Sequence, residues 1–204
     1  MRRVELPLGQ VLYRAGAPSL NVYFPNDCMV SLLATADRNR GLEVGLVGRE
    51  GMIGAPLALG VRTSPVKALV QGAGSAMRIS AAGISRELRR NPPLQRAVER
   101  CAYVAMATAM QVAVCNNVHL LEPRLARWLL MTRDRVGSDE FRFTQEFIAL
   151  MLGVRRPGVT AAASELQRRK LIRYRRGAMR IVDRKGLRAV ACSCYEVIRK
   201  TETA

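Results

Sequence analysis

The spacing of apolar residues divides the chain into an N-terminal part made of short strands and a C-terminal part made of helices. Between residues 4 and 82, alternating or β-branched apolar runs are separated by turns rich in glycine, which is typical of a small antiparallel roll or barrel. The predicted strands cover residues 10–13, 22–24, 29–33, 42–47, 68–70 and 76–79. From residue 80 onward the apolar spacing becomes three and four, which predicts helices.

A long helix is predicted after the strands. Residues 80–90 form a short helix stopped by Asn91-Pro92-Pro93, and from Leu94 to about Asn117 there is neither proline nor glycine. Along this stretch apolar or small residues alternate at spacings of four and three, a seam that suits helix pairing in a dimer. The seam consists of Leu94, Val98, Cys101, Ala105, Thr108, Val112 and Cys115. A single helix buried within one subunit would produce a similar pattern.

Residues 143–171 predict two short helices joined by a tight turn. Thr144 can cap the first helix, and Gly153 can take the left-handed conformation that ends it. The second helix directs its polar and basic side chains away from the first; these are Arg155, Arg156, Thr160, Ser164 and Gln167. This is the helix-turn-helix arrangement, whose second helix fits the major groove of DNA.

The residues that follow favour the same interpretation. Residues 171–182 predict two strands around a turn at Gly177, which form a wing. Between Arg155 and Lys185 there are eleven basic residues against Glu165 and Asp183, an electrostatic footprint for a polyanion. A solvated charged helix end would also give such a run, but its coincidence with the two helices and the wing favours DNA. Two further helices are predicted. One is opened by Glu122-Pro123, ends near Gly137 and has Trp128 in the core, and the other covers residues 185–200.

Composition narrows the class of protein. Of the 204 residues, 49% are hydrophobic, which excludes a disordered chain, and the net charge of +17 favours an acidic partner. Aromatic residues make up only 5%, so stacking on single strands or RNA is less favoured than groove binding. No apolar run of membrane-spanning length and no signal region are recognised, which predicts a cytoplasmic protein without a membrane partner.

Neither a metal centre nor an enzyme is predicted. The five cysteines form no CxxC pair, and with one histidine a zinc cluster of usual spacing cannot be assembled. Cys192 and Cys194 are the only close pair, and we expect reduced, partly buried thiols without a cofactor. His119 has no evident nucleophile beside it, and no phosphate-binding loop or nucleophile elbow is present, so catalysis is not expected.

The motifs together resemble the Crp/Fnr superfamily of bacterial transcription regulators. Residues 144–146, 152–159 and 166–177 are similar to its DNA-binding end; residues 8–16, 22–25 and 51–54 are similar to its cyclic-nucleotide-binding-like β-roll. The resemblance implies an α+β fold with an N-terminal antiparallel, jelly-roll-like β-roll (1–90), a long dimerisation helix (91–118) and a C-terminal winged helix-turn-helix (119–204). It also implies a homodimer that binds a palindromic operator in double-stranded DNA, with RNA polymerase as a partner. The family's usual N-terminal helix is shortened or missing, which suggests a native start upstream.

The resemblance assigns roles to individual residues. It places Arg156 where a guanidinium can pair with guanine O6 and N7. The DNA backbone and groove contacts are assigned to Thr144, Gln145, Arg155, Thr160, Ser164, Arg175 and Arg176. Solvation of a helix start is the alternative role for Arg155. The best-known members have a glutamate where this chain has Pro157, and an arginine where it has Ala161, so their operator cannot be carried over.

The predicted effector region departs from the family pattern. In nucleotide-binding relatives a Gly-Glu pair holds the ribose and an arginine run holds the cyclic phosphate. The corresponding residues here are Gly54, Arg62, Thr63 and Ser64; the glutamate is absent and Pro56 intrudes. The effector therefore stays unknown. Two alternatives remain: a sensor protein that responds to a cyclic nucleotide, and a non-specific architectural DNA-binding protein.

Overall fold

The computed structural model describes residues 1–37 and 40–203, and of residues 36, 37, 40 and 41 it describes the backbone alone. Contacts divide the chain into two compact units. The N-terminal unit comprises Met1–Ala34 and Val44–Ala109, and the C-terminal unit comprises Thr35–Glu43 and Met110–Ala204.

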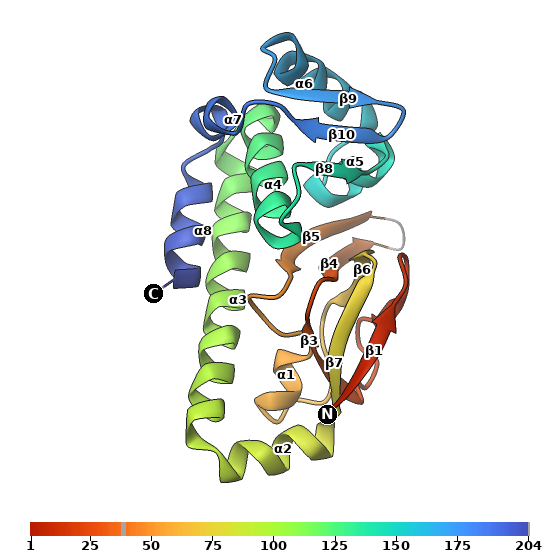
Figure 1. Ribbon diagram of the computed structural model, residues 1–204, viewed down its shortest axis with the longest axis vertical. Coiled ribbons are helices and arrows are strands. Elements are labelled where there is room, and N and C mark those ends of the chain that lie inside the picture. Colours follow the sequence, from red (N-terminus) through yellow and green to blue (C-terminus); the bar gives the residue numbers. More distant parts are fainter. Residues whose placement is uncertain (38–39, 204) are drawn as a thin grey trace. The chain divides into compact units, whose positions relative to one another are not determined.

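The strands of the N-terminal unit form two antiparallel sheets (Figure 1), and the adjoining ends of β4 and β5, from Thr35 to Glu43, are counted with the C-terminal unit. One sheet has the order β1-β7-β3, with β1 at Arg2–Leu6, β7 at Gly74–Ser80 and β3 at Asn21–Pro25. The other has the order β2-β6-β4-β5, with β2 at Val11–Tyr13, β6 at Lys67–Gly72, β4 at Met29–Asp37 and β5 at Arg40–Val47. The predicted N-terminal antiparallel β-roll is confirmed.

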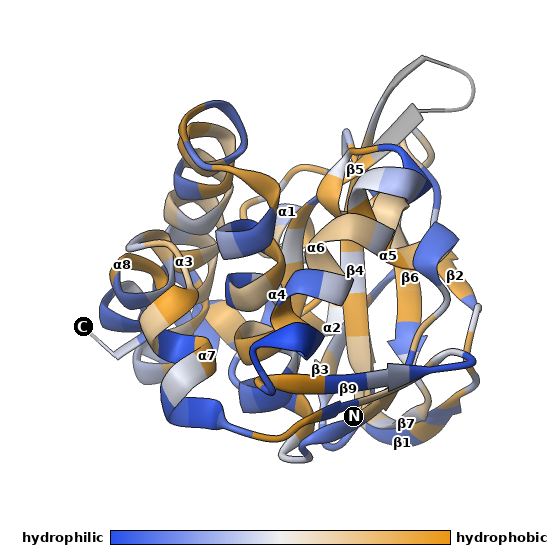
Figure 2. Cartoon of the chain, turned by 90° about the horizontal axis from the view of Figure 1, so that it is seen from above, coloured by the Kyte–Doolittle hydropathy of each residue, from blue (hydrophilic) through white to orange (hydrophobic). Residues whose placement is uncertain are grey.

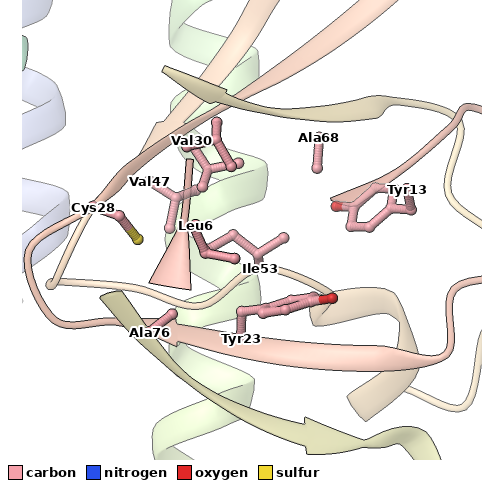
Figure 3. Packing of buried hydrophobic residues seen from close by; sticks show 10 residues of the cluster. Leu6, Tyr13, Tyr23, Cys28, Val30, Val47, Ile53, Ala68 and Ala76 are labelled. Carbon is pink, nitrogen blue, oxygen red and sulfur yellow. The ribbon is translucent and has the colours of Figure 1, made fainter. Parts of the chain in front are cut away.

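The interior of the roll is filled by alternate residues of these strands. Leu6, Val30 and Ile53 are almost fully buried, and Figure 3 shows them pointing toward one another. Successive side chains of a strand point to opposite faces, so the strands with one inward apolar face cover a common core. Strand β1 was missing from the predicted strands, because three of its five residues are charged and the apolar alternation is reduced to Val4 and Leu6.

Helices α1 (Ala55–Ala58), α2 (Ala81–Arg90) and α3 (Pro92–Val118) follow in the chain. The Ser80 hydroxyl caps α2 by accepting a hydrogen bond from the Gly83 N–H at 3.1 Å. Ile84 and Leu88 of α2 pack with Val98 of α3 in a second apolar cluster of the N-terminal unit. The four-residue helix α1 was not predicted, since so short a turn has no periodicity to detect.

The predicted seam of α3 is mostly buried within its own chain, which fits the alternative of a helix packed within one subunit. Val98, Thr108 and Val112 are buried, Leu94 and Cys101 pack against the cluster that contains Val98, and only Ala105 is exposed. The opposite side of α3 carries the exposed apolar stripe, which we define as Tyr103, Met106, Met110, Val114 and Val118. At about 100° per residue the two sets lie on opposite sides of the helix. Burial within one subunit thus explains the seam.

By length and composition α3 also meets the criterion for a helix that could span a membrane, with a mean hydropathy of 1.2 over 18 residues. Only 17% of that window is buried. The sequence pattern alone did not bring out this property, because small residues rather than long apolar ones carry much of the hydropathy.

Helix α4 (Leu121–Val136) is the central helix of the C-terminal unit. It ends at Gly137, which has the left-handed conformation and donates its N–H to the Arg133 carbonyl. Trp128 is buried, as predicted, and its indole N–H donates to the Glu43 carboxylate at 2.9 Å. The segment that contains Glu43 therefore adds a buried polar contact to this unit.

The remaining elements of the C-terminal unit complete a winged helix-turn-helix (Figure 1). They are β8 (Glu140–Arg142), α5 (Gln145–Leu152), α6 (Arg156–Arg168), β9 (Ile172–Arg175), β10 (Ala178–Ile181), α7 (Arg184–Val190) and α8 (Cys194–Thr203). One predicted helix, 185–200, is in fact two. The chain turns at Ala191, whose ψ of 145° is extended, and α8 begins with the Tyr195 N–H donating to the Cys192 carbonyl.

Candidate nucleic-acid interface

Helices α5 and α6 meet across the turn that the sequence predicted. The Thr144 hydroxyl accepts the Phe147 N–H at 3.1 Å and so caps α5. Gly153 ends the helix with a φ of 64°, and the Val154 N–H returns to the Ala149 carbonyl at 2.9 Å. A Cβ on Gly153 would lie 2.6 Å from a methyl group of Leu42, so both the backbone conformation and the space favour glycine.

Helix α6 has one buried and one exposed face. Val159 and Leu166 are fully buried, which fixes α6 against its neighbours α4 and α5. Arg156, Thr160 and Ser164, spaced by four, lie together on the exposed face. Arg155 precedes the helix as its N-cap and is exposed too.

Two polar contacts join the exposed face of α6 to α5. Arg156 forms an ion pair with Glu146 at 3.1 Å, and the Thr160 hydroxyl donates to the Gln145 side-chain oxygen at 2.8 Å. The side chains of both members of the ion pair are more than 60% exposed, so the pair contributes little to stability. Arg156 can consequently exchange this carboxylate for another acceptor at small cost.

Strands β9 and β10 form the predicted wing around a two-residue turn. Arg176 and Gly177 have φ values of 49° and 80°, which is the pattern of a type I′ hairpin turn. The Tyr174 hydroxyl donates to the Phe143 carbonyl at 2.8 Å, and the Gln167 side chain accepts the Tyr174 N–H at 2.7 Å. These bonds hold the wing against α6 and the residues that precede α5.

The exposed face of the wing sheet is lined with arginine. The strands are arranged in the order β8-β10-β9. Ala178 of the central strand lies opposite Arg142 of β8 on one side and Arg175 of β9 on the other, so the three residues form one row across the sheet. In the next row Arg180 of β10 lies opposite Glu140 of β8 and Arg173 of β9. Hydrophilic residues dominate β9 in Figure 2. Four arginines therefore share one face with one carboxylate.

Three of these arginines were not among the site residues predicted from the sequence. Arg142 lies on β8, for which no strand was predicted, so nothing in the pattern could connect it with the wing. Arg173 and Arg180 were counted only as part of the basic run. Their alternation with buried Ile172 and Met179 was the available signal, because alternate residues of a strand share a face.

A protein-family model matches part of the C-terminal unit. Residues 123–190 match the model of the Crp-like helix-turn-helix domain. The C-terminal unit therefore contains a Crp-like helix-turn-helix domain. No curated protein matches the chain.

Solved structures extend the likeness to nearly the whole chain. A transcriptional regulator of the CRP/FNR family from Thermus thermophilus is 22% identical with a TM-score of 0.75, over 93% of this chain and 98% of that one. FixK2 from Bradyrhizobium japonicum is 13% identical with a TM-score of 0.80, over 94% and 98%. The c-di-GMP-responsive global regulator CLP from Xanthomonas campestris is 18% identical with a TM-score of 0.72, over 88% and 93%.

The chain has the fold of a Crp/Fnr-type transcription regulator, so the resemblance stated from the sequence is confirmed. The β-roll, the long helix and the Crp-like domain follow one another in the predicted order. The individual DNA contacts and the boundaries at residues 90 and 118 stay predictions.

The four predicted effector residues lie in the β-roll without forming one exposed group. Ser64 is buried, whereas Arg62 and Thr63 are exposed. Burial raises the pKa of the Tyr13 phenol, and hydrogen bonds with the Ser64 side chain and the Gly54 backbone offset part of this rise. Tyr13 therefore interacts with two of the four residues. Gly54 has a φ of 94°, and an added Cβ would meet backbone atoms of residues 21 and 22.

Proposed function

We propose that this protein is a transcription regulator that binds a palindromic operator in double-stranded DNA as a homodimer. The observation that carries the proposal is the exposed face of α6, with Arg155 and Arg156 at its N-terminal end and Thr160 and Ser164 behind them. In helix-turn-helix proteins the N-terminal residues of the second helix contact base edges in the major groove. A guanidinium there can read a guanine through two hydrogen bonds.

The wing supports contacts to phosphate. Arg142, Arg173, Arg175 and Arg180 share its exposed face, and Arg176 lies at the tip of the hairpin. Arginine binds phosphate without reading sequence, so these residues would position the protein on the duplex. Contacts between these arginines and the phosphates would neutralise part of the protein's net charge of +17.

The exposed apolar stripe of α3 supports the homodimer. Its five residues are each more than 50% exposed, which leaves a continuous apolar row along the helix. Two such helices packed in a symmetric pair would cover both rows. A twofold axis would also repeat the α6 face, which is the symmetry that a palindromic operator requires.

Selection from a pool of random duplexes tests the proposal. We expect enrichment of two inverted half-sites with centres about 10–10.5 base pairs apart, or a multiple of this. Affinity for the selected site should exceed that for random DNA by a factor on the order of 10³ or more at physiological salt. A steep salt dependence without any enriched sequence would instead indicate a non-specific architectural protein.

A further inference from the structure

Three cysteines that are far apart in the sequence meet inside the C-terminal unit. Cys115 lies near the end of α3, Cys192 lies in the corner between α7 and α8, and Cys194 is the first residue of α8. All three are buried, and their sulfur atoms lie within 4.8 Å of one another. The Sγ atoms of Cys115 and Cys192 are 3.5 Å apart. The three residues form an apolar cluster of their own.

The backbone around two of these thiols is held by hydrogen bonds. The Cys192 N–H donates to the Pro123 carbonyl at 3.3 Å, and the Tyr195 N–H donates to the Cys192 carbonyl at 3.0 Å. The Ser193 carbonyl accepts the next hydrogen bonds of α8. Because this corner is fixed, Cys192 and Cys194 can present their sulfur atoms to Cys115 without a large rearrangement.

Two buried guanidinium groups lie beside the three thiols. Arg124 and Arg127 both interact electrostatically with Cys115. Each is less than 10% exposed, and among the described residues neither forms an ion pair with a carboxylate. The Nε atoms of both lack a hydrogen-bond partner in the described part of the chain. Buried charges are costly unless paired, so the surroundings favour an anionic group at the cysteines.

We propose that Cys115, Cys192 and Cys194 bind a single thiophilic metal ion, and that this ion is Cu(I). Three sulfur atoms around one ion at about 2.3 Å lie about 4.0 Å apart. The sulfur atoms found here lie within 4.8 Å of one another, with the Cys115–Cys192 pair at 3.5 Å, so only small shifts would be needed. Soft sulfur ligands select soft ions. Binding would replace the S–H protons by metal–sulfur bonds, and the protons would leave to solvent.

The number of ligands and the charge distinguish Cu(I) from Zn²⁺. Among the described histidines, cysteines, aspartates and glutamates, the group at this place has only three members, whereas structural Zn²⁺ takes four ligands. Cu(I) is satisfied by three thiolates. One positive charge against three negative ones leaves two negative charges, which the guanidinium groups of Arg124 and Arg127 balance.

The test uses the reduced full-length protein under anaerobic conditions, titrated with Cu(I) held by a chromophoric chelator. The protein should take one Cu(I) per chain from the chelator. The variants Cys115→Ser, Cys192→Ser and Cys194→Ser should each lose affinity by about a hundredfold or more. Cys101→Ser is the matched control and should bind as the unaltered protein does. Equal binding by all four variants would overturn the proposal.

A second measurement needs no variant and so does not depend on whether each one folds. X-ray absorption of the unaltered protein with one equivalent of Cu(I) should show three sulfur neighbours around the metal. Oxygen or nitrogen neighbours in place of sulfur, or no uptake at all, would refute the site. Tighter binding of Zn²⁺ than of Cu(I) would refute the choice of ion. Because no step involves DNA, failure here leaves the proposed function untouched.

Discussion

Arg156 and Arg175 are both exposed, but they lie on different elements, and this difference determines what each can contact. Arg156 starts α6, and in helix-turn-helix proteins the N-terminal end of this helix is the part that enters the major groove. Arg175 ends β9 on the wing, where phosphate is the nearest part of a duplex. Under the proposed function, the same guanidinium group would therefore read a base at one position and bind the DNA backbone at the other.

The two arginines should respond differently to substitution by alanine. Arg156→Ala should lose about 1–3 kcal/mol of discrimination at one base pair in each half-site. Arg175→Ala should weaken binding to all duplexes evenly and reduce the salt slope by about one for each subunit. Fluorescence anisotropy with the selected site, its single-base variants and random DNA measures both effects. A uniform loss of affinity in both variants would contradict the assigned roles.

At the scale of the element, the turn between α5 and α6 sets the orientation of the exposed α6 face. Gly153 ends α5 with a positive φ, and the Thr160–Gln145 hydrogen bond joins the two helices beyond the turn. Val159 and Leu166 hold the other side of α6 in the core. A change in the turn should therefore reach the DNA-binding face.

Gly153→Ala tests this turn. Alanine at this φ should lower the free energy of unfolding by about 1–2 kcal/mol, because a Cβ disfavours the left-handed conformation. Affinity for the operator should fall as well. Chemical denaturation and anisotropy measure the two effects, with Gly45→Ala as control, since a Cβ there makes only an ordinary contact with Leu32.

A second substitution separates strain from crowding at this turn. Asparagine tolerates the left-handed region, so Gly153→Asn should recover most of the stability if the backbone conformation is the cause. If Gly153→Asn is as unstable as Gly153→Ala, crowding against Leu42 is responsible instead.

At the scale of the whole molecule, the two sides of α3 differ in what covers them. The seam with Val98 and Val112 is buried in its own chain, and the exposed apolar stripe is left for a partner. The stripe also explains why α3 meets a membrane-span criterion by composition while little of it is buried. A second copy of the chain would bury such a stripe.

Met110→Glu should dissociate the dimer. Met110 is 61% exposed, so a carboxylate there does not disturb the isolated chain, but in a dimer it would be buried without a partner. Both copies would bury a carboxylate at about 3 kcal/mol or more each, so the dissociation constant should rise on the order of 10⁴-fold. Sedimentation velocity measures the change, and Leu8→Glu, on an exposed turn residue, serves as the control. A dimer that persists unchanged would exclude the stripe as the interface.

Much of the fold and of the candidate DNA-binding site could be predicted from local pattern. The alternation around Gly177, the cap at Thr144 and the break at Gly153 depend on residues a few positions apart, so their signals are present in the sequence. The helices α4 and α3 were found for the same reason. Strand β1 was missed because it needs a partner from elsewhere in the chain, namely β7, with which it pairs about seventy residues later.

The sequence by itself determined the periodicity of each element, the caps and turns between elements, and the concentration of basic residues after Arg155, because each follows from neighbouring residues and their backbone preferences. The tertiary structure decided which side of α3 is buried, that Arg142 joins the wing face, and that Cys115 lies against Cys192, although 77 positions separate them. A helical repeat specifies that two sides differ, but only packing against the rest of the chain selects the side that is covered.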